Sequence, residues 1–205
     1  MKILSVAILA CFSVTTLLAQ STAEGFKSIT LKKENGAEIV FSSKARSVTI
    51  DVYSSDIKPT DNPGELLIGD KVLTYTLAAD NSTPRERTSE GAQKARLLSY
   101  MKSRLDYTKH IAKLHYTHAW HEWQYINDKV CLMWSYDVQN QNGTALKQVN
   151  LSTCCFDNIL NLNTSSVKED DTDPNKALLV GAAQTLKQND FKIDFREQYK
   201  KLRAK

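Results

Sequence analysis

Alternating hydrophobic and polar positions along the first third of the chain predict short strands. Ile29 and Leu31 precede the segment Glu34-Asn35-Gly36, and Ile39 and Phe41 follow it. A three-residue loop with Gly36 in the left-handed conformation makes this a hairpin. That register predicts Leu31 opposite Ile39 and Ile29 opposite Phe41, all on one face. Similar patterns predict further strands at 48–52, 66–68 and 72–77.

A long helix is predicted after these strands. Thr83-Pro84-Arg85-Glu86 combines an N-cap residue, a proline at the first helical position and a glutamate three residues after the cap, which is a capping box. Spacings of three and four then predict one buried face, made of Ala95, Leu98, Met101, Leu105, Thr108, Ala112 and His115. The opposite face, which carries Lys94, Arg96, Lys102, Arg104, Lys109 and Lys113, is expected to be solvated.

A four-stranded antiparallel meander follows, with strands near 120–126, 130–138, 149–155 and 159–162. Alternation over 130–138 predicts one core face. A second helix over 177–186, capped by Asp173-Pro174, is expected to bury Leu178, Leu179, Ala182, Ala183 and Leu186. The chain is therefore expected to be an α+β protein: an antiparallel sheet of N-terminal strands and a meander, with one long helix and a C-terminal helix, arranged as a sandwich.

The first nineteen residues have the layout of a secretory signal peptide, with Lys2, an apolar run from Ile3 to Leu18, and small Ala19. The expected organisation is a signal peptide at 1–19, a single α+β domain at 20–195 and a charged tail at 196–205. The mature chain contains no apolar stretch long enough to span a membrane. We therefore expect export to the periplasm or the extracellular space. Because Ile8-Leu9-Ala10-Cys11 resembles a bacterial lipobox, the alternative is a lipid anchor on Cys11.

The histidines suggest a possible metal site. All four lie between His110 and His121. Imidazoles and carboxylates bind zinc or copper, so His115, His118, His121 and Glu122 are the candidate ligands. A strand at 119–126 would point His121 and Glu122 to opposite faces, and the His-Glu-x-x-His motif is absent. The other interpretation is surface histidines at a helix end.

Three cysteines follow the leader: Cys131, Cys154 and Cys155. If Trp134 pairs with Leu151, Cys131 lies opposite Cys154, so a disulfide between them is predicted. Cys155 then faces the core. The alternative is three reduced thiols that behave as small apolar residues.

The aromatic residues gather in the first hairpin of the meander. Alternation places Trp120 and Trp123 on opposite faces, so one of them is expected to be exposed, and both are candidate binding residues. Trp134 and Tyr136 are expected in the core. Asn150 and Asn163 begin Asn-x-Ser/Thr sequons, although Asn150 lies in a predicted strand.

The second half of the chain resembles a known group. Residues 129–136 and 147–156, the turn at 157–158 and the helix to 186 look like small exported proteins of Bacteroidota. The order of elements over 84–195 resembles the PsbP-like α/β/α sandwich. The resemblance implies binding or assembly rather than catalysis, and it assigns no functional residue.

The leading interpretation is therefore an exported, non-catalytic binding or assembly protein without a cofactor. Its expected partner is a protein or a cell-envelope component. Twenty-seven basic and 23 acidic residues, scattered along the chain, do not favour nucleic acid. One alternative is a small metal-binding or hydrolytic protein that uses His115, His118, His121 and Glu122 with zinc or copper. Another is a protein that binds an apolar small molecule between sheet and helix.

Overall fold

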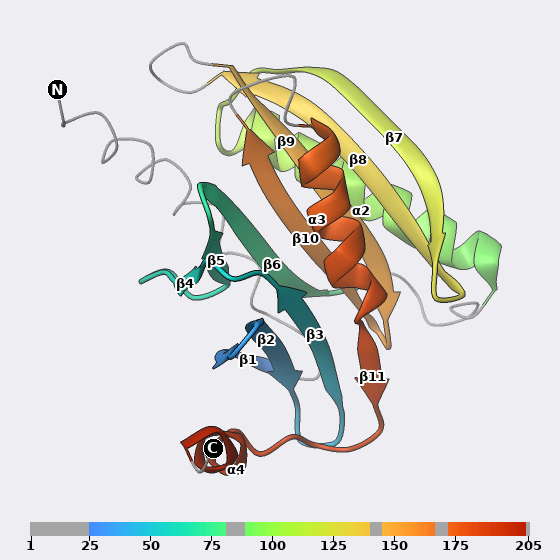
Figure 1. The fold of residues 1–205 in the computed structure, drawn as a ribbon. Helices are drawn as coiled ribbons and strands as arrows, with labels where there is room; N and C mark the ends of the chain where they lie inside the picture. The colour runs from blue at the N-terminus through green and yellow to red at the C-terminus, as the bar shows by residue number, and fades with distance from the viewer. Residues whose placement is uncertain (1–24, 81–88, 140–144, 167–171, 204–205) are drawn as a thin grey trace, which may run out of the picture.

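The computed structural model describes residues 25–80, 89–139, 145–166 and 172–203. The predicted signal peptide, Cys11 and the capping box at 83–86 lie outside these ranges. The described residues form two antiparallel sheets and the helices α2 (Glu90–His110), α3 (Thr172–Gln184) and α4 (Phe195–Arg203) (Figure 1).

The smaller sheet has the order β1-β2-β3-β11, with β1 (Lys27–Lys33), β2 (Gly36–Ser42), β3 (Ser47–Tyr53) and β11 (Lys187–Asn189). The larger sheet has the order β4-β5-β6-β10-β9-β8-β7, with β4 (Ile57–Pro59), β5 (Glu65–Ile68), β6 (Lys71–Ala79), β7 (Tyr116–Ile126), β8 (Lys129–Gln139), β9 (Ala145–Cys155) and β10 (Asn158–Ser166). The predicted α+β class and the antiparallel meander β7-β8-β9-β10 are confirmed.

The larger sheet is the middle layer of the fold. Helix α2 contacts β7, β8 and β9 on one face, and α3 lies on the opposite face over β9 and β10 (Figure 1). The smaller sheet occupies the same layer as α3, because β11 follows α3 and pairs with β3. The middle layer is thus covered on both sides.

Two hydrophobic clusters correspond to the two faces of the larger sheet. One cluster, on the α2 side, includes Leu97, Leu132 and Trp134. The other joins the smaller sheet and α3 to the larger sheet and includes Met133 and Leu179. The prediction of one core face for β8 was therefore incomplete, because a strand in a middle layer buries both of its faces.

The register of the first hairpin differs from the prediction by one residue. Gly36 belongs to β2, where it pairs with Lys33, so the connection has two residues and Thr30, not Leu31, lies opposite Ile39. A Cβ atom at Gly36 would lie 2.0 Å from the carbonyl oxygen of Val52. Glycine is therefore required here by the close approach of β3 and by its positive φ of 153°, although it lies in β2 and not in the loop.

The pairing of β8 with β9 also differs by one residue. Trp134 lies opposite Asn150, and Met133 lies opposite Leu151. A shift of one residue exchanges the faces of a strand. The residues of β9 that share the α2 face with Trp134 therefore include the polar Gln148, Asn150 and Ser152.

Helix α2 ends at His110, so Ala112 and His115 lie beyond it and do not extend its buried face. The Arg96 side chain, which was expected to be solvated, is buried. Its Nε donates a hydrogen bond to the carboxylate of Asp80, at the end of β6. Ala95, which was expected to be buried, is exposed. A buried arginine is tolerated because the Asp80 carboxylate pairs with it.

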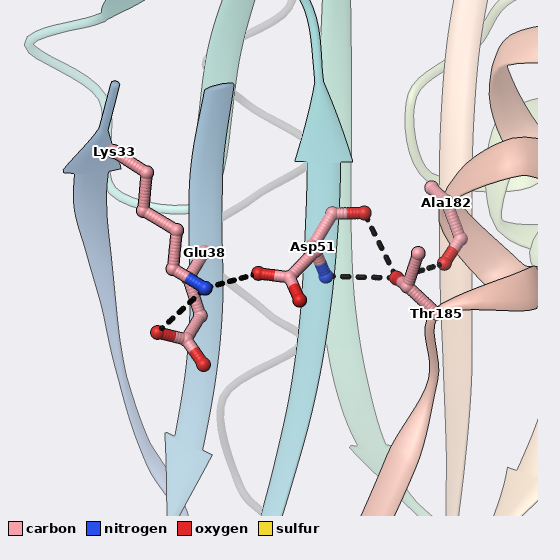
Figure 2. A network of polar contacts seen from close by, with 5 residues as sticks. All are labelled: Lys33, Glu38, Asp51, Ala182 and Thr185. Carbon is pink, nitrogen blue, oxygen red and sulfur yellow. Dashed lines mark hydrogen bonds and ion pairs between the residues drawn. The ribbon is translucent and has the colours of Figure 1, made fainter. Parts of the chain in front are cut away.

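Thr185, between α3 and β11, holds α3 to the edge of β3 (Figure 2). Its Oγ1 accepts a hydrogen bond from the Asp51 backbone N at 2.8 Å, and it lies 2.8 Å from the carbonyl oxygens of Asp51 and Ala182. On the outer face of the same sheet, the Lys33 ammonium lies 2.5 Å from Asp51 Oδ1 and 3.3 Å from Glu38 Oε2. Polar contacts therefore tie β1, β2, β3 and α3 together.

Replacing Thr185 with alanine leaves the Asp51 N–H without its acceptor. We expect Thr185→Ala to lower the free energy of unfolding by about 1–3 kcal/mol, as for a partly buried donor that loses its partner. Thr185→Ser keeps the hydroxyl, so we expect it to lower the free energy of unfolding by less than Thr185→Ala does. Urea unfolding, monitored by circular dichroism, measures the free energy of unfolding of both variants. Equal stability of Thr185→Ala and the wild type would show that the contact contributes nothing.

Candidate functional site

The predicted binding and metal residues gather on and just before β7, one of the two outer strands of the larger sheet. This strand pairs on one side only, with β8. Its regular pairing is interrupted between Thr117 and Trp120, where the register shifts. His118 lies in this β-bulge with a φ of 51°, in the left-handed region.

The four candidate metal ligands are not brought together. His115 precedes β7 and is exposed. His118 is exposed, and its Nδ1 lies 2.9 Å from Asp137 Oδ2. His121 and Glu122 point to opposite faces, because they pair with successive residues of β8. Among the described residues, no three His, Cys, Asp or Glu side chains are grouped so that they could hold a metal ion.

Trp120 and Trp123 lie on opposite faces of β7, as the alternation predicts. Trp120 is 40% exposed, and the Lys176 ammonium of α3 lies 4.4 Å from its ring centroid. Trp123 is half-buried toward α2, where the Lys94 ammonium lies 5.4 Å from its ring centroid. Tyr125, which belongs to the same group of aromatic residues in this hairpin, is 60% exposed. The exposed aromatic rings of β7 are thus Trp120 and Tyr125.

The predicted Cys131–Cys154 disulfide is absent, and Cys131, Cys154 and Cys155 are free. Its expected register was wrong, because Cys131 lies opposite Thr153 and Cys154 therefore points to the other face of the sheet. Burial raises the pKa of the Cys131 thiol, that of Cys154 to about 11 and that of Cys155 to about 12. Such thiols are protonated at neutral pH and are poor nucleophiles.

Hydrogen-bonded polar side chains cross the α2 side of the larger sheet. We call this set the polar row; its members are Trp134 of β8, Asn150 and Ser152 of β9, and Asn161 and Asn163 of β10. Trp134 Nε1 donates to Ser152 Oγ at 3.0 Å, and Ser152 donates to Asn161 Oδ1 at 2.7 Å. The Nδ2 atoms of Asn161 and Asn163 donate to Asn150 Oδ1 at 3.3 and 3.0 Å.

From the sequence, Asn150 and Asn163 were identified only as the first residues of sequons. Asn150 is 3% exposed, and Asn161 is 7% exposed. Buried amides require hydrogen-bond partners, and the polar row supplies them for Asn161 and for the Asn150 oxygen, whereas Asn150 Nδ2 has no acceptor among the described residues. The available signal in the sequence was polar residues at alternate positions of two neighbouring strands, which places them on one face of the sheet: Asn150 and Ser152 in β9, and Asn161 and Asn163 in β10.

The comparisons with known proteins concern the fold. No protein-family model and no curated protein sequence matches the chain. The solution structure of cyanobacterial PsbP (CyanoP) from Synechocystis sp. PCC 6803 is similar, with 12% identity, a TM-score of 0.43, and coverage of 79% of this chain and 91% of that one. The crystal structure of PA94, a protein of unknown function from Pseudomonas aeruginosa, has 11% identity, a TM-score of 0.40, and coverage of 78% and 96%.

Within the described ranges, no helix has the length and apolar character that a membrane span requires.

The thiols provide a test of the β8–β9 register. We expect Cys131, Cys154 and Cys155 to resist alkylation in the native protein at about pH 8, and to react rapidly after denaturation, because their raised pKa values and burial keep them protonated. As pH rises toward these pKa values, the thiolate fraction and the reaction rate should increase. Mass spectrometry after alkylation, with and without prior reduction, counts the thiols. A thiol that becomes reactive only after reduction would show that a disulfide exists.

Proposed function

We propose that the chain is an exported, non-catalytic binding protein, and that its partner, a protein or cell-envelope component, pairs with the edge of β7. The observation that carries this proposal is the length of that edge. The outer strands of the two sheets are β1, β11, β4 and β7. They have 7, 3, 3 and 11 residues, so β7 is the longest outer strand in the described structure.

An outer strand has backbone N–H and C=O groups with no partner on its free side. An extended segment of another protein can add to such an edge, with the backbone providing affinity and alternate side chains providing specificity. The bulge at His118 disturbs the first part of β7, so the regular portion from Trp120 to Ile126 is the favoured docking stretch.

The exposed rings flank this stretch on both faces of the sheet. Trp120 lies on the α3 side and Tyr125 on the α2 side. Each ring is oriented by a neighbouring polar contact: Lys176 lies over Trp120, and the Tyr125 hydroxyl donates to Glu90 Oε1 at 2.5 Å. A strand added beside β7 would therefore meet an aromatic side chain on either face, and large rings contribute much of the binding energy at interfaces.

Export in this proposal depends on the signal peptide expected at 1–19. The proposal assigns no chemistry to the thiols, because burial keeps them protonated. No contact in the described residues favours the alternative of a zinc or copper site at His115, His118, His121 and Glu122.

Photo-crosslinking at matched aromatic positions tests the proposed docking edge. Benzoylphenylalanine replaces Trp120 or Tyr125 on β7, and in control variants it replaces Tyr53 or Phe191, which are 69% and 62% exposed and lie away from β7. We expect discrete heavier adducts after irradiation of exporting cells from the two β7 positions and none from the controls. Immunoblotting detects the adducts, and fractionation of the same cells checks export.

Adducts that form equally from Tyr53 and Phe191 would contradict docking at β7. The same conclusion would follow if neither β7 position formed an adduct in the exported protein. Retention of the chain in the cytosol would contradict the export expected from the leader, independently of the docking result.

A further inference from the structure

The net charge of the chain is concentrated in its last nineteen residues. Residues 187–205 contain seven of the 27 basic residues and three of the 23 acidic residues, so the residues before them carry 20 of each sign. The whole formal charge of +4 therefore belongs to the segment that begins with β11 and includes α4. A positive surplus confined to one short segment favours a negatively charged partner at that place.

Helix α4 lies at an outer end of the molecule. It contacts β1, and Figure 1 shows it beyond the smaller sheet, away from α2. Phe195 and Gln198 are half-buried and three residues apart, so they mark the face by which α4 is held to the protein. The helix therefore has a second face that is open.

The open face of α4 is basic and carries an aromatic ring. Arg196 lies three residues before Tyr199 and four residues before Lys200, so these side chains share one face of the helix. All three are exposed, and Tyr199 is 52% exposed. Basic side chains beside an aromatic ring are typical of helices that lie on a membrane surface.

Hydrogen bonds fix the segment before α4 to the end of the smaller sheet. Ser42 Oγ accepts from the Ile193 backbone N at 3.1 Å and lies 2.9 Å from the Ile193 carbonyl oxygen. Ser47 Oγ donates to the carbonyl oxygen of Phe191 at 2.9 Å. Residues 191–193 therefore lie beside the turn that joins β2 to β3.

This part of the molecule adds exposed residues of the same two kinds. Phe191 is 62% exposed, and Lys192 and Lys44, the latter in the β2–β3 turn, are also exposed. We call the whole set the C-terminal basic surface; its members are Lys44, Phe191, Lys192, Arg196, Tyr199 and Lys200. None of its four basic side chains forms an ion pair with a carboxylate of the described residues, whereas Lys33 of β1 is paired with Asp51 and Glu38.

We propose that the C-terminal basic surface binds a lipid bilayer that contains anionic phospholipids, with the open face of α4 against the headgroups. Each lysine or arginine near a negatively charged membrane strengthens binding. The rings of Phe191 and Tyr199 suit the interface between headgroups and acyl chains, where aromatic side chains are favoured.

The position of α4 favours a bilayer over a nucleic acid. A helix at an outer end of the molecule can approach a flat surface (Figure 1), whereas proteins that bind single-stranded nucleic acid typically enclose the strand in a basic groove. This inference goes beyond the docking proposed at β7, because the two surfaces share no residue.

Co-sedimentation of the full chain with lipid vesicles tests the proposal. One set of vesicles is pure phosphatidylcholine, and the other contains equal parts of phosphatidylcholine and phosphatidylglycerol. We expect the wild type to bind the anionic vesicles about tenfold or more tightly than the neutral ones, and to be released as salt is added, because salt screens exposed charges. Residues 1–19 are present in every variant, so their contribution is the same throughout.

Matched charge variants locate the binding surface. Arg196→Gln combined with Lys200→Gln should weaken binding to the anionic vesicles by about tenfold or more. The control combines Lys102→Gln with Lys109→Gln, which removes two exposed positive charges from α2 instead. This control should leave the affinity unchanged.

Ring variants separate a bilayer from other polyanions. Phe191→Ser and Tyr199→Ser should each reduce the fraction bound to anionic vesicles, because each removes an exposed ring from the surface. Tyr53→Ser is the control, since Tyr53 is 69% exposed and lies at the opposite end of β3 from Ser47. Circular dichroism checks that each variant folds as the wild type does.

Several outcomes would overturn the proposal. One is equal binding of the wild type to neutral and anionic vesicles, or binding to neither. Another is an equal loss in the α4 and α2 double variants, which would indicate general charge attraction. A third is binding of single-stranded RNA as tight as that of anionic vesicles at the same phosphate concentration, with the ring variants unchanged on vesicles. If the α4 double variant does not fold, the wild type on the two kinds of vesicle and the ring variants decide. None of these results depends on crosslinking at β7.

Discussion

Burial of both faces of the larger sheet is the constraint on which the rest of the fold depends. Leu132 points toward α2 and Met133 toward the opposite layer, and both are fully buried. A sheet with two apolar faces needs a cover on each side. Helix α2 provides one cover, and α3 with the smaller sheet provides the other. The contacts of Arg96 with Asp80 and of Thr185 with Asp51 then attach these covers at defined positions.

Local patterns in the sequence were sufficient for most elements but not for their pairing. Alternation identified the meander, and spacings of three and four identified α2. Both hairpin registers were displaced by one residue, because the loop lengths were inferred from turn residues and Gly36 is required by the approach of β3 instead. Strand β11 consists of Lys187, Gln188 and Asn189, which carry no hydrophobic pattern, so only its pairing with β3 makes it a strand.

The same limit applies to the candidate sites. Alternation placed Trp120 and Trp123 on opposite faces of β7, because that depends on the strand alone. The polar row was not predicted from the sequence, because polar positions in an alternating strand are ordinarily assigned to the solvent-exposed face. Asn150 is buried only because α2 and the neighbouring strands enclose that face, and no local window of sequence contains that information. The displaced β8–β9 register also explains the wrong expectation for Cys131 and Cys154.

The pairing of β11 with β3 has a consequence for the order in which the molecule assembles. Lys187 pairs with Thr49, and Thr185 binds Asp51 across a separation of 134 residues. β1, β2 and β3 come long before β11 in the chain, so the edge of β3 stays open until β11 has emerged. Closing such a distant pair is entropically slow. A chain truncated before residue 187 would keep that edge permanently open, with the tendency to self-associate that open edges carry.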